Sequence, residues 1–242
     1  MTMVVMDILE ELAKVPKQPE NLASCDLLGF DTETTGLGEG NSIISASLVL
    51  RDRKSGEDKV FNFLLNPHVP IDPGAAAVNG FTQEFVEKNG GDQKKGVEKM
   101  AQAILLAQQK GIPLVAYNAK FDIAMLQSDL RKVGRGDLAE KLSGISVLDP
   151  LVFDRELSRR PGKRKLENAM EWWGICPRGD YHDAQVDTQA AVDLMCAISS
   201  RHPELPLPAM DWQREAYKRW AEGWNKWAQE KGARKVEEEW GL

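Results

Sequence analysis

The chain has 242 residues and a formal net charge of −6, with 42% hydrophobic and 28% charged residues. This balance is typical of a soluble globular protein that can bury a sizeable core. The acidic excess argues against a general nucleic-acid coat and against a membrane-surface protein, because both need a basic surplus. It does not exclude an enzyme that holds nucleic acid through metal ions bound to carboxylates.

Cysteine content and hydropathy point to a reducing, aqueous compartment. The three cysteines lack CxxC spacing, which argues against a disulfide framework and against a structural zinc site. No apolar run approaches the ~20 residues of a transmembrane helix, and residues 1–6 lack the basic start and cleavage site of a signal peptide. We therefore expect a cytoplasmic protein with no membrane partner.

The first third of the sequence predicts one helix and three strands. Residues 7–20 form a short amphipathic pattern that ends at two prolines. Residues 27–30 are a compact apolar run leading into Asp31 and predict a central strand buried on both faces. Residues 42–50 and 60–65 predict two further strands joined by a hairpin, and the Pro- and Gly-rich stretch 66–80 predicts a loop.

The following segments alternate between helix and strand. Three strands in a meander, then strand, helix, strand and more helices, describe an α/β fold with a mixed sheet covered on both faces. The pattern predicts strands at 112–117 and 145–148 and helices at 93–110, 119–133, 150–157, 166–173 and 184–200.

From residue 201 the composition changes. A Pro-containing linker precedes a long predicted helix over 211–231, and five of the seven tryptophans lie from Trp212 onward. We therefore divide the chain into an N-terminal helical extension (1–22), a main domain (23–200) and a Trp-rich helical tail (201–242). The tryptophan stripe must bury its aromatic surface, either by packing on the main domain or by docking a partner, and the pattern leaves both open.

Acidic side chains interrupt the predicted core in three places. Asp31 and Glu33 project from the same face of the first strand, at its carboxyl end. Two carboxylates there repel each other and lose hydration unless a cation holds them together. The alternative is an ordinary exposed strand end followed by a turn.

Two predicted helices carry an acid on their apolar stripe. Asp122 could favour the positive end of its helix dipole, with Asn118 as the N-cap, but neither role explains its place on that stripe. Asp187 is not needed as a cap, because Asp183 is a suitable N-cap. Four such carboxylates select Mg²⁺ or Mn²⁺ over zinc. A pair of these ions is suited to in-line attack on a phosphodiester.

Three short motifs resemble those of the DEDD 3'–5' exonucleases, in the histidine subtype, and most closely the DnaQ-like proofreading type. Residues 30–37 (FDTETTGL) resemble the first motif, residues 117–122 (YNAKFD) the second and residues 182–187 (HDAQVD) the third. Their order and intervals match over roughly residues 25–200. Asn79 stands where the family commonly has His, which affects a peripheral contact.

The resemblance implies an RNase H-like fold, with a five-stranded mixed sheet that has one antiparallel strand and flanking helices, plus an extra C-terminal helix. It also implies a metal-dependent exonuclease that uses two Mg²⁺ or Mn²⁺ ions. Such an enzyme removes nucleoside 5'-monophosphates from the 3' ends of single-stranded or frayed DNA. The same resemblance allows a polymerase or another protein as partner through the Trp-rich helix.

By the same resemblance, Asp31, Glu33 and Asp187 hold the first metal, and Asp31 bridges to the second. Asp122 acts mainly through metal-bound water, and His182 is the general base.

Four further residues receive the substrate by this resemblance. Thr34 and Leu37 bind the terminal nucleotide, while Asn118 and Phe121 shape the pocket floor.

The sequence leaves two alternative functions open, and it also leaves open the role of residues 159–165. The chain could trim RNA 3' ends, because no residue pattern separates ribose from deoxyribose. It could also be a catalytically silent interaction module that docks through its tail. Residues 159–165 contain five basic side chains, which either follow a phosphate backbone or form a solvated loop between helices.

Overall fold

The computed structural model describes residues 7–38, 40–176, 178–179 and 183–242. A six-stranded sheet forms its centre, with the strand order β4-β3-β2-β1-β5-β6. Strand β2 is antiparallel to both neighbours, and the other pairs are parallel. The strands are β1 (Leu27–Thr34), β2 (Ile43–Arg51), β3 (Asp58–Asn66), β4 (Gly91–Asp92), β5 (Leu114–Val115) and β6 (Val147–Leu148).

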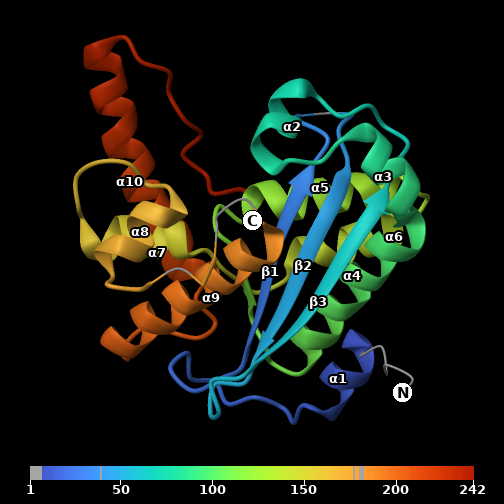
Figure 1. The fold of residues 1–242 in the computed structure, drawn as a ribbon. Coiled ribbons are helices and arrows are strands. Elements are labelled where there is room, and N and C mark those ends of the chain that lie inside the picture. Colours follow the sequence, from blue (N-terminus) through green and yellow to red (C-terminus); the bar gives the residue numbers. More distant parts are fainter. Residues whose placement is uncertain (1–6, 39, 177, 180–182) are drawn as a thin grey trace.

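Helices cover the sheet in two groups (Figure 1). Helices α4, α5 and α6 enclose one apolar cluster, and α7, α8 and α9 enclose the other. The helices are α1 (Ile8–Lys14), α2 (Pro73–Asn79), α3 (Gln83–Asn89), α4 (Gln93–Gln109), α5 (Lys120–Lys132), α6 (Gly136–Lys141), α7 (Pro150–Ser158), α8 (Leu166–Trp172), α9 (Ala184–Arg201) and α10 (Met210–Lys231), with a 3₁₀ turn at Leu142–Gly144. Among the described helices, none combines the length and the apolar character needed to cross a bilayer.

The predicted α/β fold with one antiparallel strand and an extra C-terminal helix is confirmed, with two corrections. The sheet has six strands rather than five, because the two-residue strand β4 pairs with the end of β3. The predicted loop 66–80 contains helix α2. Asp72 caps this helix by accepting a hydrogen bond from the Gly74 N–H, and Gly80 ends it with a left-handed φ of 74°. Pro and Gly mark helix ends as well as loops, so composition alone misassigned the segment.

Gly29 allows helix α9 to lie directly on strand β1. A Cβ atom at this position would come within 2.6 Å of side-chain carbons of Thr188 and of Val192. Real Cβ contacts are longer than that, so any larger residue would push α9 away from the sheet. The close approach fixes the first turns of α9 against the strand that carries Asp31 and Glu33.

The C-terminal tail packs on the main domain along the first half of α10. Gln213 and Ala216 are buried, Trp212 stacks on Phe153 of α7 at 4.8 Å between ring centroids, and Trp240 near the chain end joins the core. After α10 the chain returns toward α5 (Figure 1). The second half of α10 remains more open, and Trp224 and Trp227 are 37% and 46% exposed.

Candidate active site

Three of the four predicted carboxylates meet at the carboxyl end of β1. Asp31 and Glu33 extend from this strand, and Asp187 comes from the first turn of α9. One carboxylate oxygen from each residue lies within 4.8 Å of the others. All three side chains are partly exposed, so the cluster is accessible from outside the protein.

Burial and mutual repulsion raise the pKa values of two members of this cluster. Burial, together with the negative charges of Asp122, Asp187 and Glu33, raises the pKa of Asp31 well above its ordinary value. Burial and the charges of Asp187 and Asp122 raise the pKa of Glu33 to about 7. A cation at this place would remove the repulsion.

Asp122 borders the cluster from the first turn of α5. It is 3% exposed, and its Oδ1 accepts hydrogen bonds from the Thr32 N–H at 3.0 Å and the Thr32 hydroxyl at 2.7 Å. Burial raises the pKa of Asp122 to about 7, although the bonds from Thr32 oppose the shift. Asp122 is thereby tied to the strand between Asp31 and Glu33, which explains an acid on an apolar helix face.

His182, the predicted base, lies outside the described residues. The residue after it, Asp183, caps α9 as predicted, because its Oδ1 accepts hydrogen bonds from the backbone N–H groups of Gln185 and Val186. Asn118 does not cap α5. It adopts a left-handed φ of 62°, and the helix begins after Ala119 without a side-chain cap.

The four predicted substrate residues divide into two pairs. Asn118 and Phe121 line a cavity of about 450 Å³ along α5, which we call the α5 cavity. Leu37 is 83% exposed on the loop after β1. Thr34 is buried, and its hydroxyl donates to the Gly36 carbonyl, so it shapes that loop.

Asn79 lies closer to the cluster than the sequence suggested. Its side-chain amide donates to the Thr34 carbonyl at 3.1 Å, and a hydrogen bond from Asn79 to Glu33 partly opposes the rise in the pKa of that carboxyl. The position where the family commonly has His is therefore in contact with the carboxylate cluster. The sequence did not predict this contact, because it indicated a loop where the short helix α2, which ends at Asn79, lies.

Sequence reasoning also missed Asp149, which follows strand β6 and is 2% exposed. Its carboxylate accepts hydrogen bonds from the backbone N–H groups of Asn118, Ala119 and Leu151 at 2.9 to 3.1 Å. Burial raises the pKa of Asp149 to about 6 against these bonds. The available signal was that an acid directly follows the buried strand β6.

The C-terminal helix completes this connection. The Gln213 side chain accepts from the Asp149 N–H at 2.7 Å and donates to the Val147 carbonyl at 2.6 Å. Gln213 is fully buried. A chain of buried hydrogen bonds therefore runs from α10 through Asp149 to the turn that starts α5 and places Asp122.

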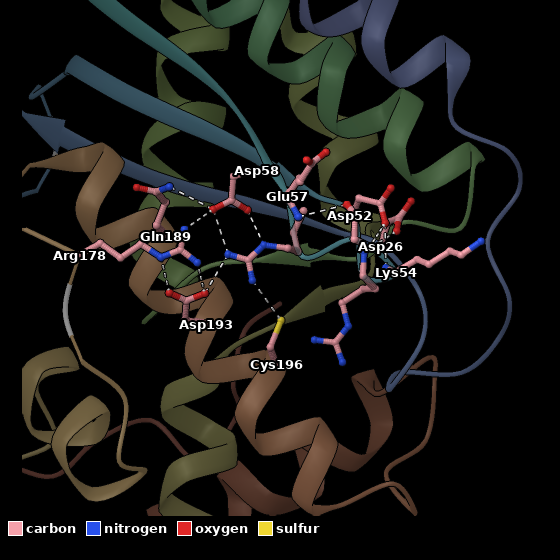
Figure 2. A network of polar contacts seen from close by, with 12 residues as sticks. Asp26, Asp52, Lys54, Glu57, Asp58, Arg178, Gln189, Asp193 and Cys196 are labelled. Atoms are coloured by element: carbon pink, nitrogen blue, oxygen red, sulfur yellow. Dashed lines mark hydrogen bonds and ion pairs between the residues drawn. The ribbon is translucent and has the colours of Figure 1, made fainter.

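A separate polar network holds the body of α9 (Figure 2). Arg51 at the end of β2 binds Asp58 of β3 and, at 2.8 Å, Asp193 of α9. Arg178 also binds Asp193, and Gln189 donates to Asp58 at 3.0 Å. These contacts anchor the helix that carries Asp187.

The clustered residues fit hard divalent cations. Asp31, Glu33 and Asp187 offer only carboxylate oxygens, which Mg²⁺ and Mn²⁺ prefer over nitrogen or sulfur. Their partial exposure leaves coordination positions for water and substrate. Among the described residues, this is the group of acidic side chains with the spacing of a metal site.

Comparison with known proteins places these residues in a family. A family model described as Exonuclease (RNase_T) matches residues 28–195, which include all four carboxylates. The chain is 30% identical over 187 residues to the DNA polymerase III subunit epsilon of Haemophilus influenzae, covering 73% of this chain and 68% of that protein. It is 28% identical to the PolC-type DNA polymerase III of Caldanaerobacter subterraneus, covering 75% of this chain and 12% of that one.

Solved structures show the same fold at low sequence identity. Exonuclease I matches with a TM-score of 0.61 and 19% identity, over 74% of this chain and 42% of that chain. Pop2p of S. pombe, in a form bound to Mg²⁺ and Mn²⁺, matches with a TM-score of 0.62 and 14% identity, over 81% and 88% of the two chains. The chain thus spans only part of several proteins that it resembles. Since the family model covers well over half of its length, the chain belongs to the exonuclease family.

Proposed function

We propose that this chain is a 3'–5' exonuclease that removes nucleoside 5'-monophosphates from single-stranded or frayed DNA ends. The observation that carries the proposal is the cluster of Asp31, Glu33 and Asp187. Their carboxylate oxygens lie within 4.8 Å of one another although burial and repulsion raise the pKa values of Asp31 and Glu33. Carboxylates gathered this closely are stabilised when a cation lies among them.

In this proposal Asp31, Glu33 and Asp187 would hold divalent metal, and Asp31 would also serve a second ion. Such ions would supply an activated water and offset negative charge at the reacting phosphate. Asp122, which accepts two hydrogen bonds from Thr32, would act mainly through metal-bound water.

We assign the role of general base to His182 from its place five residues before Asp187. An imidazole with an ordinary pKa near 6.5 accepts a proton at neutral pH.

The terminal nucleotide enters the α5 cavity in this account. Asn118 and Phe121 form its lining, and exposed Leu37 contacts the base from the loop after β1. A cytoplasmic location fits this activity. We assign the open half of α10, with Trp224 and Trp227, to a protein partner such as a polymerase, because these side chains remain exposed when the tail packs on its own domain.

A digest of labelled strands tests the activity and its direction. A 5'-labelled single-stranded DNA is incubated with Mg²⁺, Mn²⁺ or EDTA, beside an RNA strand of the same sequence. The expected result is a ladder that shortens from the 3' end with either metal and no cleavage in EDTA. Faster digestion of the RNA would replace DNA with RNA as substrate, and full activity in EDTA would contradict the metal-dependent site.

A further inference from the structure

A second cavity adjoins the α5 cavity, since Asn118 lines both. It also measures about 450 Å³, and we call it the α8 cavity because residues at the start of α8 form one wall. Tyr117 and Asn118 form another wall, and Asp187 of the carboxylate cluster completes the lining. A strand whose 3' nucleotide occupied the α5 cavity would therefore have room for its preceding nucleotide in the α8 cavity.

Arg164, which lines the α8 cavity, is held in place by Asp154, which is fully buried on α7. Arg160 and Arg164 both form ion pairs with its carboxylate, at 2.9 and 2.7 Å, and the Trp173 indole donates to it at 3.0 Å. Burial alone would raise the pKa of Asp154, but the bonds from Arg160, Arg164 and Trp173 outweigh it and hold the pKa below its ordinary value. These two arginines of the basic segment 159–165 therefore shape the loop.

The backbone of the next residue, Lys165, starts α8, but its side chain takes no part in holding the loop. Its side chain is 65% exposed, and its ammonium group lies 3.9 Å from the nearest paired acid, Glu167, which is itself 47% exposed. An ion pair this open and this long contributes little to stability. The backbone beside Lys165 is nevertheless fixed, because the Tyr117 hydroxyl donates to the Arg164 carbonyl at 2.6 Å. A lysine held this way at a cavity beside an acidic cluster is placed to bind an anion.

We propose that Lys165 binds a backbone phosphate of the substrate strand, upstream of the bond that is cut. This inference rests on the proposed exonuclease function, which supplies the strand. The carboxylate cluster repels the strand's phosphates, and Lys165 offsets that repulsion at the point where the chain leaves the cluster. Leu151, Leu166 and the Tyr117 ring line the same cavity and offer apolar surface to the sugar and base.

Binding of a 5'-fluorescein-labelled dT₈ strand in Ca²⁺, measured by fluorescence anisotropy, tests this role. Lys165→Ala is compared with Lys163→Ala, which removes a second exposed lysine of the same segment that does not line the cavity. We expect Lys165→Ala to weaken binding by about 3- to 10-fold and to lower the slope of log Kd against log salt by about 0.7, the value for one phosphate contact on a single strand. Equal behaviour of the two variants would overturn the proposal.

Replacing single phosphates by uncharged linkages identifies the phosphate that Lys165 contacts. Strands are made with one methylphosphonate at the first, second or third linkage upstream of the bond that is cut. The wild-type protein is expected to lose affinity at one of these positions, and Lys165→Ala to lose none further there, because both changes remove the same contact. Additive losses at all three linkages would show that Lys165 contacts none of them.

Hydrolysis of a small ester separates this inference from the proposed function. The p-nitrophenyl ester of thymidine 5'-monophosphate contains only the phosphodiester that is cut, so Lys165→Ala should hydrolyse it with wild-type kcat/KM. A loss on the ester as large as the loss on the strand would place Lys165 at the reacting phosphate and overturn the proposal. If the wild-type protein cleaves neither substrate, the proposed function fails, while the methylphosphonate series still decides the role of Lys165.

Discussion

Helix α9 takes part in two groups of buried or half-buried acids. The pKa is lowered in one group and raised in the other. Near its middle, Asp193 shares Arg51 and Arg178 with Asp58, and the Arg51 and Gln189 bonds outweigh burial and hold the pKa of Asp58 below its ordinary value. In its first turn, Asp187 meets Asp31 and Glu33, and the pKa values of both partners rise. The first group, drawn in Figure 2, balances its own charge, whereas in the second Asp31 and Glu33 face other carboxylates, an arrangement that an external cation would stabilise.

Removing one acid from each group should have opposite effects on activity and on stability. We expect Asp31→Asn to lower the exonuclease rate by at least about 10³-fold while the melting temperature in EDTA at pH 8 stays level or rises, because repulsion is relieved. Asp193→Asn should leave the rate within about 3-fold at 25 °C. It should lower the melting temperature by about 6–12 °C, because Arg51 loses a buried partner.

Rates and melts of both variants provide the measurement. If Asp31→Asn proved strongly destabilising and Asp193→Asn proved inactive but stable, the roles assigned to the two groups would be reversed.

The next largest loss of activity is expected when the general base is removed. His182→Ala should lower kcat by about 10²–10⁴-fold, the usual effect of removing a positioned base, with Mn²⁺ affinity largely kept. Tyr181→Phe is the matched control and should be nearly silent, because tyrosine at this spacing fits neither subtype of the family. Steady-state rates on a DNA strand decide between them, and a silent His182→Ala beside a crippled Tyr181→Phe would mean the wrong subtype.

Asp149 tests whether the cluster depends on a supporting carboxylate that binds no metal. Asp149→Asn keeps the shape but turns one acceptor oxygen into a donor facing backbone N–H groups, so the turn that places Asp122 should loosen. We expect activity to fall by about 10- to 100-fold with a higher half-saturating Mg²⁺ concentration. The control is Asp137→Asn on α6, where the acid pairs with Arg135 away from the cluster.

If Asp149 acts by positioning the turn before α5, Asp149→Asn should also speed hydrogen exchange at the Asn118 and Ala119 amides. An activity loss with unchanged exchange and unchanged Mg²⁺ dependence would argue that Asp149 acts in some other way.

The tail should show the smallest effect on catalysis. Trp240→Ala should lower the melting temperature by about 6–15 °C, because it empties a large buried site. Trp224→Ala should change it by less than about 2 °C, since that side chain is 37% exposed. A chain that ends at Pro208 loses Gln213 as well and should melt lower than either variant. An unchanged melt for the shortened chain would leave partner docking as the tail's main role.

The sequence predicted the strand and helices that carry Asp31, Glu33, Asp122 and Asp187. It also singled out these acids, because an acid that interrupts an apolar pattern is visible without coordinates. It could not predict Asp149 or Gln213. Asp149 reads as an ordinary helix cap before Pro150, and its contacts to Asn118 depend on how strands β5 and β6 align. Gln213 reads as a surface residue on a Trp-rich helix, and only the docking of α10 buries it.

Calorimetric titration of the metal-free protein with Mn²⁺ tests the central claim most directly. Burial and repulsion raise the pKa of Glu33 to about 7, so this carboxyl is largely protonated at pH 6.5 and Mn²⁺ must displace its proton. Repeating the titration in buffers of different ionisation heat should reveal more proton release at pH 6.5 than at pH 8.5, and no comparable binding in Asp31→Asn. Absence of binding to the wild-type chain, or wild-type affinity in Asp31→Asn, would contradict the account.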